Sequence, residues 1–545
     1  MEAQSKSLTR FLIPFFAVCA PFAIATLATE SIFLRLLTLA VAILALFIYA
    51  KGLHREVFNP DSRTQKAVIV FISVLFILLS LFICAVSIEN EWMHEYPLEK
   101  KVDDYGCYPQ MFDAFQKGQL NIDTETDLSI LESLENPYDT AARREATGVK
   151  YGPTWDRAFY NGKLYSYFGI APIIFLYYPV YFLTGKVLSD ALAAAIMTAL
   201  GAIFMLLIIC ELCIRMKNKP PFLALIAVGT TLPCVALLWS TETCANFYHL
   251  AVLSGICAAC AFFYHVLKGE SASDGLWRKL HFAFAGICVA CIVASRPNLV
   301  LYVFIAMPLL ISVIIKRENG LKSLLYDIAS FCLPMFFLGS LIMAYNNARF
   351  GSPFDFGANY QLTLADTSTY SLSGALFIPS LYHFFLQPPS FDEVFPFIHP
   401  VARRMSEYSV DRTVYVSHSI GSAFFPLTWG AVLIPSLYRE NKRKFLTAVI
   451  AVLCVVFLAF FDLCFGGVHL RYLADIMFVL ALLGGYMLLN ALSNMPADSS
   501  RRYVVYTIIA VLCAASMLVE LPFIFDNERD MIMKYHSYFY DFIKG

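Results

Sequence analysis

Two adjacent carboxylates mark the stretch of this sequence best suited to acid–base chemistry. Asp103 and Asp104 stand in VDDYGCY, shortly after an apolar run that ends near residue 88. A carboxylate at the boundary between water and lipid stays hydrated enough to ionise, and it can take the proton of a hydroxyl group. The pair therefore predicts a general base. The alternative is a pair of solvated loop charges.

Two isolated arginines indicate anion binding. Arg296 lies in ASRPNL and Arg471 in GGVHLRYLAD, and each is the lone cation in a short connection between apolar runs. A guanidinium can bind phosphate through two parallel hydrogen bonds, so we expect the two to approach each other and hold a lipid phosphate. The alternative is that they only extend toward the membrane surface. Lys163 and His469 are further candidates for this site.

Three more polar residues stand beside apolar runs. Glu242 lies in LWSTETCANFYH, and a carboxylate at a membrane edge indicates function unless it is simply exposed at the interface. Asp156 opens WDRAFYNGKLYSYFGIAP, where it either orders the turn before YNGK or binds substrate. Tyr167 belongs to a group of tyrosines that suits the interface, because a ring can be buried while its hydroxyl stays hydrated.

The composition shows which elements must position these residues. Of 545 residues, 59% are hydrophobic and only 15% are charged, which is typical of a polytopic membrane protein. The net charge of −1 gives no basic surface for nucleic acid. Most of the 15 cysteines lie in apolar runs, so they predict packing and no disulfide framework.

Apolar runs predict an all-α protein with about thirteen transmembrane helices, each close to the roughly 20 residues that a bilayer requires. The first could instead be a signal peptide, but a second apolar run follows it directly, which favours a span. The expected spans are 11–29, 32–50, 67–88, 189–213, 221–239, 247–266, 281–295, 298–315, 327–345, 417–437, 446–463, 472–492 and 503–525.

Lysines and arginines concentrate in alternate connections, including 51–66, 214–220 and 438–445, which the positive-inside rule places in the cytoplasm. The long segments 89–188 and 346–416 then lie outside, and 170–185 must rest at the interface, since a crossing there would invert every later loop. SGALFIPSLYHFFLQPPS in the second segment is too short and proline-broken to span. We therefore divide the chain into an N-terminal hairpin (1–66), a core (67–345), a second outer loop (346–416) and C-terminal helices with an outer tail (417–545).

From about residue 67 onward the sequence resembles the GT-C superfamily of integral-membrane glycosyltransferases, which includes protein O-mannosyltransferases and bacterial lipid A aminoarabinose transferases. The resemblance rests on the order and outward placement of several motifs, none of them diagnostic alone. These are VDDYGCY, FDAFQKGQLNID, NPYD, WDRAFYNGKLYSYFGIAP, ASRPN, RFGSPFDFG and HLRYLAD.

The resemblance implies an inverting transfer of sugar from a polyprenyl-phosphate donor to an extracytoplasmic hydroxyl, in a multi-pass cell-membrane protein. Asp103 or Asp104 matches the family's base, and Glu242 matches its second acidic position. Some members carry Asp-x-Asp or Glu-x-Asp, whereas these two aspartates are adjacent, so a divalent metal is left open as a cofactor. The acceptor is a glycan, a lipid or a protein.

The main alternative is a transporter or lipid flippase. Such proteins often place ionisable residues near the bilayer midplane on broken helices. Here the ionisable residues gather at the outer edge, and the deep exceptions are few, with Asp462 at the edge of its span and Asp475 one turn into its span. A third reading, a membrane scaffold without catalysis, leaves the outward carboxylates and arginines unexplained.

Overall fold

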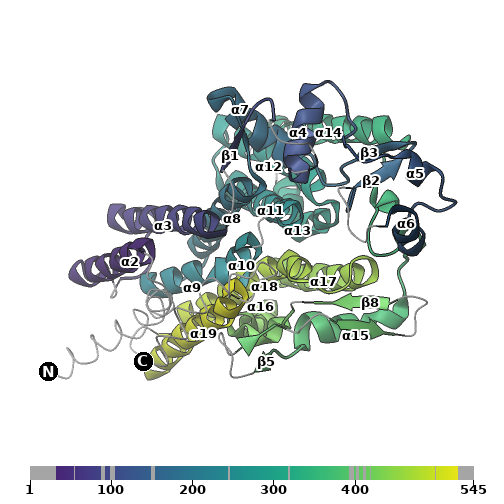
Figure 1. Cartoon of the computed structure of the whole chain (residues 1–545). Helices are drawn as coiled ribbons and strands as arrows, with labels where there is room; N and C mark the ends of the chain where they lie inside the picture. Colours follow the sequence, from purple (N-terminus) through teal and green to yellow (C-terminus); the bar gives the residue numbers. More distant parts are fainter. Residues whose placement is uncertain are drawn as a thin grey trace.

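The computed structural model describes residues 32–525 except 54–55, 88–91, 99–102, 104, 149–153, 244–245, 317–319, 392–397, 401–403, 409–412, 418 and 497–498. The expected span 11–29 and the outer tail beyond residue 525 lie outside these residues. The described chain is dominated by long apolar helices, with short two-stranded sheets (Figure 1). This confirms the predicted all-α polytopic class.

Within the described residues, ten helical segments are long and apolar enough to cross a membrane. α2 (Ile32–Ala50) precedes them and packs against the first, α3. One of them is interrupted at Leu237, where φ is 59°, and Arg296, before a proline, separates two others. The ten are α3 (Arg63–Ser87), α8 (Asp190–Ile214), α9 (Phe222–Val235) with α10 (Leu238–Thr243), α11 (Phe247–Ser271), α12 (Leu276–Ser295), η4 (Pro297–Tyr302) with α13 (Val303–Lys316), α14 (Gly320–Phe350), α17 (Lys442–Phe465), α18 (Leu470–Ser493) and α19 (Ser500–Phe525).

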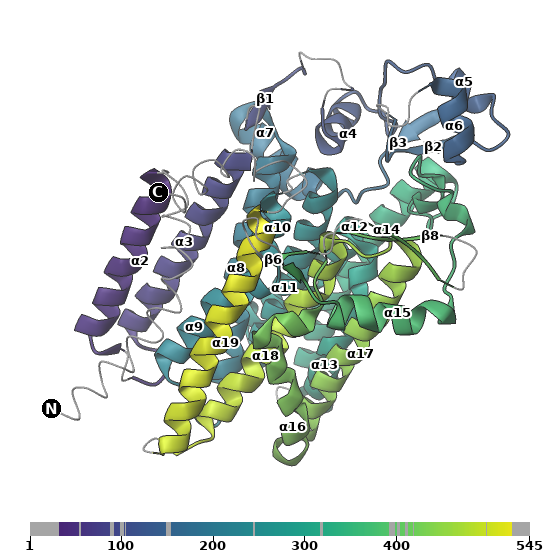
Figure 2. The same ribbon diagram turned by 60° about the horizontal axis from the view of Figure 1, so that its bottom comes forward.

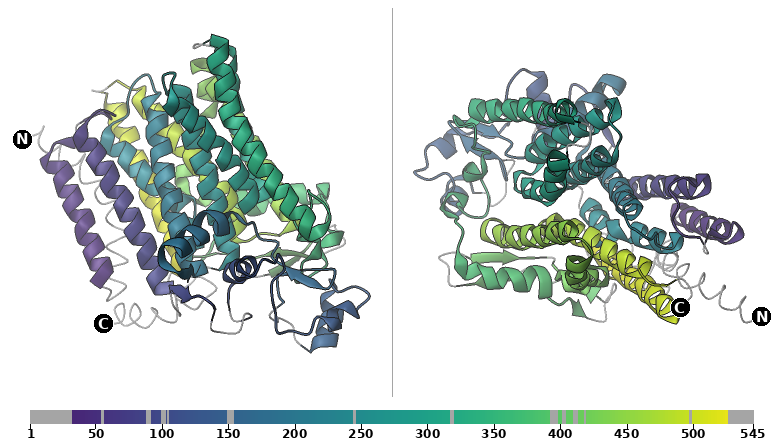
Figure 3. Two further views of the ribbon diagram at one scale, coloured as in Figure 1. Left: turned by 90° about the horizontal axis from the view of Figure 1, so that it is seen from above. Right: turned by 180° about the vertical axis from the view of Figure 1, so that it is seen from behind.

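The helices form one bundle, with α2 and α3 at one edge and α14 at the opposite edge (Figures 2 and 3). α18 lies at its centre, and 89% of its most apolar stretch is buried, against 6% for α14. A buried ion pair between Arg278 Nε and Asp327 Oδ2, 2.7 Å apart, ties α14 to α12. The exposed apolar face of α14 is what a helix in contact with lipid requires.

Contacts between connections sort them onto two ends of the bundle. At one end the chain before α3 pairs with the chain before α9, through Phe58 N–H to Pro220 O at 2.8 Å. At the other end the two long segments meet each other and the short connections, as in Ser417 N–H to Val468 O at 2.9 Å. We call these the short-loop end and the long-loop end. The grouping matches the alternation that the charges predict.

The first long segment folds over the long-loop end (Figure 3). It contains β1 (Met93–Glu95), α4 (Cys107–Gln116), α5 (Ser129–Glu132), α6 (Thr140–Thr147) and the hairpin of β2 (Ala158–Tyr160) and β3 (Lys163–Tyr165). The hairpin turn is Asn161-Gly162, both with positive φ, a pair that favours this turn.

The apolar stretch 170–185 after this hairpin does not form a membrane-spanning helix. It forms η3 (Ile173–Tyr177) and α7 (Tyr178–Thr184), followed by β4 (Lys186–Leu188), which pairs antiparallel with β1. These two helices are too short to span, and the pairing returns the chain to the end it came from before α8 begins. The prediction for 170–185 as a segment that does not cross is therefore confirmed.

The described residues of the second long segment also contain no spanning helix. Its helical part is η7 (Gly374–Leu376), α15 (Phe377–Leu381) and η8 (Tyr382–Leu386), which Figure 2 shows lying across the bundle helices. The pairs β5 (Ser390–Phe391) with β6 (Ile398–His399) and β7 (Arg404–Glu407) with β8 (Thr413–Val416) follow.

The expected span over 417–437 is wrong in its bounds. The helical run is instead η10 (Pro426–Leu433) with α16 (Ile434–Glu440). The preceding chain is already bonded elsewhere, since Gly421 N–H donates to Gln387 O at 2.7 Å. Eight 3₁₀ residues at about 2.0 Å each and seven α residues at about 1.5 Å reach roughly 26 Å, so this short run nearly crosses the hydrocarbon core.

Candidate active site at the long-loop end

Arg296 stands where two helices are forced apart. Pro297 has no N–H to continue α12, and Arg296 adopts φ −151° and ψ 92°, so the helix stops there. Its side chain reaches Asp475 of α18, with Nη2 and Nε at 2.5 and 2.6 Å from the same Oδ2. The carboxylate is fully buried, whereas 16% of the arginine side chain is exposed.

A second carboxylate lies beside this ion pair. Asn298 donates from Nδ2 to Asp462 Oδ1 of α17 at 3.1 Å, and Tyr302 donates its hydroxyl to the backbone oxygen of Asp475 at 2.8 Å. The break after Arg296 thus ties η4 to both α17 and α18. Linked polar groups at low dielectric strengthen one another and fix a single arrangement.

Arg471 lies in the first turn of α18 and approaches the same place. Its guanidinium carbon is 4.7 Å from the ring centre of Tyr248 and 5.1 Å from that of Tyr472. The guanidinium carbon of Arg296 is also 5.1 Å from the Tyr472 ring centre. The two guanidinium carbons are therefore no more than twice that distance apart, so the structure brings together the two arginines that the sequence singled out.

The two arginines differ in their charge balance. Arg296 is paired with Asp475, but Arg471 has no carboxylate within 4.0 Å among the described residues. The charges of Asp156 of the first long segment and Asp475 of α18 both act on it at longer range. Arg471 is therefore the guanidinium with positive charge available to an anionic ligand.

Asp156 is held in place by the second long segment. Its N–H donates to Leu362 O at 3.0 Å, while Leu362 N–H donates to Arg157 O at 2.9 Å. Asp156 adopts φ 52°, and only 5% of it is exposed. Burial raises the pKa of its carboxyl, although a hydrogen bond from Thr363 and the charge of Arg471 oppose this. The carboxylate therefore faces the cluster as well as ordering the turn.

Two side chains link Asp156 to its surroundings. Arg157 binds Gln110 Oε1 of α4 through Nη2 at 2.8 Å, and its guanidinium carbon lies 5.0 Å from the Phe247 ring centre. Burial raises the pKa of Tyr167 well above its ordinary value, and the charges of Asp156 and Arg471 both act on its hydroxyl. Tyr167 therefore lies close enough to feel the charges of this cluster.

α4 brings the residues after the aspartate pair against the same cluster. Tyr108 is fully buried, and its burial raises the pKa of its hydroxyl, a shift that the positive charge of Arg296 partly opposes. Gly106 is needed just before α4, because a Cβ there would lie 2.2 Å from Oδ2 of Asp190. The chain that follows VDD is thus packed close to both α8 and Arg296.

The remaining predicted residues lie in different settings. Asp103 accepts hydrogen bonds from Thr124 Oγ1 at 3.1 Å and Glu125 N–H at 3.0 Å, so it holds a loop, and Asp104 lies outside the described residues. Lys163 is exposed on the β2–β3 hairpin. His469 caps α18 and stacks on Tyr415 with ring centres 5.2 Å apart.

The interpretation of Glu242 as part of an exposed connection is wrong. It lies in α10 with no exposed surface, because the helix resumes after Leu237 and continues through these residues. Its carboxylate is beside the hydroxyls of Ser80 of α3 and Thr198 of α8. It belongs to the buried interior of the bundle and has no contact with the two arginines in the described structure.

The site contains groups that the sequence reasoning did not select. Asp462 and Asp475 were noticed only as deep carboxylates, although an ionisable residue inside an apolar run is itself a functional signal. Tyr248 and Tyr472 have no distinguishing signal in an aromatic-rich chain. Among the described residues no three His, Cys, Asp or Glu side chains are grouped to hold a metal ion.

No protein-family model matches the chain, and no curated protein does. Among solved structures, ArnT from Cupriavidus metallidurans bound to undecaprenyl phosphate is similar at 11% identity and a TM-score of 0.39, over 86% of this chain and 77% of ArnT. Archaeal oligosaccharyltransferase AglB from Archaeoglobus fulgidus, in complex with an inhibitory peptide and a dolichol-phosphate, has 13% identity and a TM-score of 0.40, over 88% of this chain and 60% of AglB. The likeness is one of overall helix arrangement.

Proposed function

We propose that this protein transfers a sugar from a polyprenyl-phosphate donor to an acceptor hydroxyl at the long-loop end of the bundle, on the extracytoplasmic side of the cell membrane. The observation that carries the proposal is the convergence of Arg296 and Arg471 on the ring of Tyr472. A pair of guanidinium groups at a lipid boundary suits a phosphate that is attached to an apolar chain.

The proposed reaction requires charge stabilisation at the phosphate. The acceptor oxygen forms a bond to the anomeric carbon, the bond from that carbon to the phosphate oxygen breaks, and the phosphate leaves with the bonding electrons. Arg471 stabilises the negative charge that develops there. Asp475 orients Arg296, so that a second guanidinium faces the departing group without adding a full uncompensated charge.

A carboxylate must take the acceptor proton in the same step. Inversion follows if this base and the leaving phosphate lie on opposite faces of the sugar. Asp103 already accepts two hydrogen bonds from its own loop, which favours Asp104 as the base of the pair. Asp156 supports the acceptor or the sugar, since it is buried beside Arg471 and Tyr167.

The test is glycosyl transfer by the purified full chain with a synthetic polyprenyl-phosphate sugar and a panel of glycan, lipid and peptide acceptors. General-base catalysis is worth about 10²–10⁴ in rate, so Asp104→Asn should lower kcat by that factor. The matched control is Asp103→Asn, which we expect to retain most activity.

Full activity in both folded variants would exclude the aspartate pair as the base. Movement of the lipid-linked sugar across vesicles without any transfer product would instead establish the transporter alternative.

A further inference from the structure

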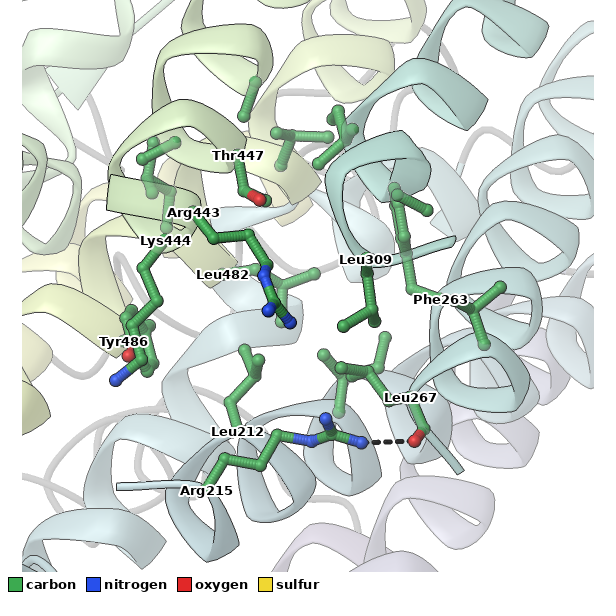
Figure 4. Close-up of a pocket in the computed structure, with 18 of the residues that line it drawn as sticks. Leu212, Arg215, Phe263, Leu267, Leu309, Arg443, Lys444, Thr447, Leu482 and Tyr486 are labelled. Atoms are coloured by element: carbon green, nitrogen blue, oxygen red, sulfur yellow. Dashed lines mark hydrogen bonds between the residues drawn. The ribbon is translucent and has the colours of Figure 1, made fainter. Parts of the chain in front are cut away.

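A cavity of about 290 Å³ lies at the short-loop end, far along the bundle helices from the arginine cluster. It is enclosed by α8 and α11 on one side and by α13, α17 and α18 on the other. Its walls are mostly apolar, so they suit a hydrocarbon chain better than a polar solute. The walls include Leu212, Phe263, Leu309, Ala451 and Leu482 (Figure 4).

Three cations stand at the charged rim of this cavity, and two of them are neutralised. Arg215 pairs with Glu270 at 2.5 Å and also donates to Leu267 O. Lys444 pairs with Glu440 at 3.0 Å and lies 5.8 Å from the ring centre of Tyr486. Both of these positive charges are therefore engaged by neighbouring carboxylates.

The third cation, Arg443, is different. It donates to Ser312 Oγ at 2.8 Å but has no carboxylate within ion-pair distance in the described part of the chain. Figure 4 shows its guanidinium directed into the cavity between Leu482 and Leu309. A cation turned toward an apolar space carries a desolvation cost unless an anion meets it there.

The rim of this cavity lies at the ends of membrane-crossing helices. Arg443 is the second residue of α17, and Arg215 directly follows the last residue of α8, so both mark helix ends. The apolar walls extend from these ends into the membrane-crossing parts of the same helices. An occupant must therefore carry its negative charge at the membrane surface and its apolar part within the bundle.

We propose that this cavity binds an anionic phospholipid, with one acyl chain between the helices and the phosphate on Arg443. A free phosphate would leave the apolar walls unfilled, and a neutral lipid would leave Arg443 uncompensated. A polyprenyl phosphate shares this chemistry, and competition with it is one outcome of the test. This inference does not depend on the proposed function.

Native mass spectrometry of the full chain in detergent tests the proposal, with phosphatidylglycerol and phosphatidylcholine of identical chains as the probes. The wild type should retain phosphatidylglycerol preferentially. Arg443→Gln should weaken that retention roughly tenfold, the effect of losing one charge-assisted hydrogen bond. Lys442→Gln is the matched control, because Lys442 is exposed and does not line the cavity.

Ala451→Leu provides a second variant that keeps every charge. It adds three carbons inside the cavity and should reduce retention while the protein remains folded by its melting temperature. Equal retention of the two lipids, wild-type retention in Arg443→Gln, or equal loss in Lys442→Gln would overturn the proposal. So would a competition experiment in which inorganic phosphate or a polyprenyl phosphate displaces phosphatidylglycerol at equal concentration.

Discussion

Replacement of Arg471 gives the sharpest test of the donor site. Its guanidinium lies between Tyr248 and Tyr472 and has no carboxylate within 4.0 Å among the residues described, so Arg471→Gln removes a charge without breaking an ion pair. Arg296 is less suitable, because its loss would leave Asp475 buried and unpaired and would affect folding as well as binding.

The expected size of the effect follows from the contact that is lost. A hydrogen bond to a charged group contributes about 1.5–3 kcal/mol, and about 1.4 kcal/mol corresponds to a tenfold change. Arg471→Gln should therefore raise the KM for the polyprenyl-phosphate donor by roughly 10- to 100-fold, with a smaller effect on the KM for the acceptor.

The assay is steady-state transfer at varied donor concentration, with folding checked by melting temperature. Arg471→Lys should recover part of the loss, since it restores the charge but not the planar pair of donors. Arg501→Gln makes the same chemical change at an exposed position in the first turn of α19 and should be neutral. Unchanged donor KM in folded Arg471→Gln would refute the phosphate role.

Three further predictions concern stability, pH and sidedness. Asp475→Asn should lower stability by about 3–5 kcal/mol by leaving Arg296 unpaired, and adding Arg296→Gln should restore part of it; a wild-type melting temperature for Asp475→Asn would contradict this. Burial raises the pKa of Asp156, so its protonated form contributes stability below its ordinary pKa of about 3.9, and that contribution is lost as pH rises through the raised value. Asp156→Asn should therefore unfold with a weaker pH dependence over that interval, and identical profiles would exclude the effect. In a background without reactive cysteines, an impermeant reagent applied to intact cells should label Glu125→Cys and spare Lys217→Cys; the reverse would invert the proposed orientation.

Most of the architecture could be predicted because a membrane span is a local property. A run of about 20 apolar residues must hide its own backbone polar groups in a helix, whatever its neighbours are. The lysines and arginines of the connections predicted that 170–185 does not cross the membrane, because a crossing there would invert every later helix. It failed at 417–437, where a 3₁₀ run covers the distance with fewer residues than an α-helix needs.

The site was only partly predictable because it depends on which helices are neighbours. The sequence selected Arg296 and Arg471 as isolated cations, but it gave no reason to pair Arg296 with Asp475, which is 179 residues away. It also assigned Glu242 to a surface, whereas packing against α3 and α8 buries it completely.

The sequence by itself therefore determined where most helices lie along the chain, since hydropathy acts within one segment. Only the tertiary structure decided that one arginine pairs with a buried carboxylate while the other has no carboxylate within 4.0 Å among the described residues, on the same tyrosine ring. The physical reason is that ion pairing at low dielectric changes steeply over a few ångströms, and those distances are set by how α12, α17 and α18 pack together.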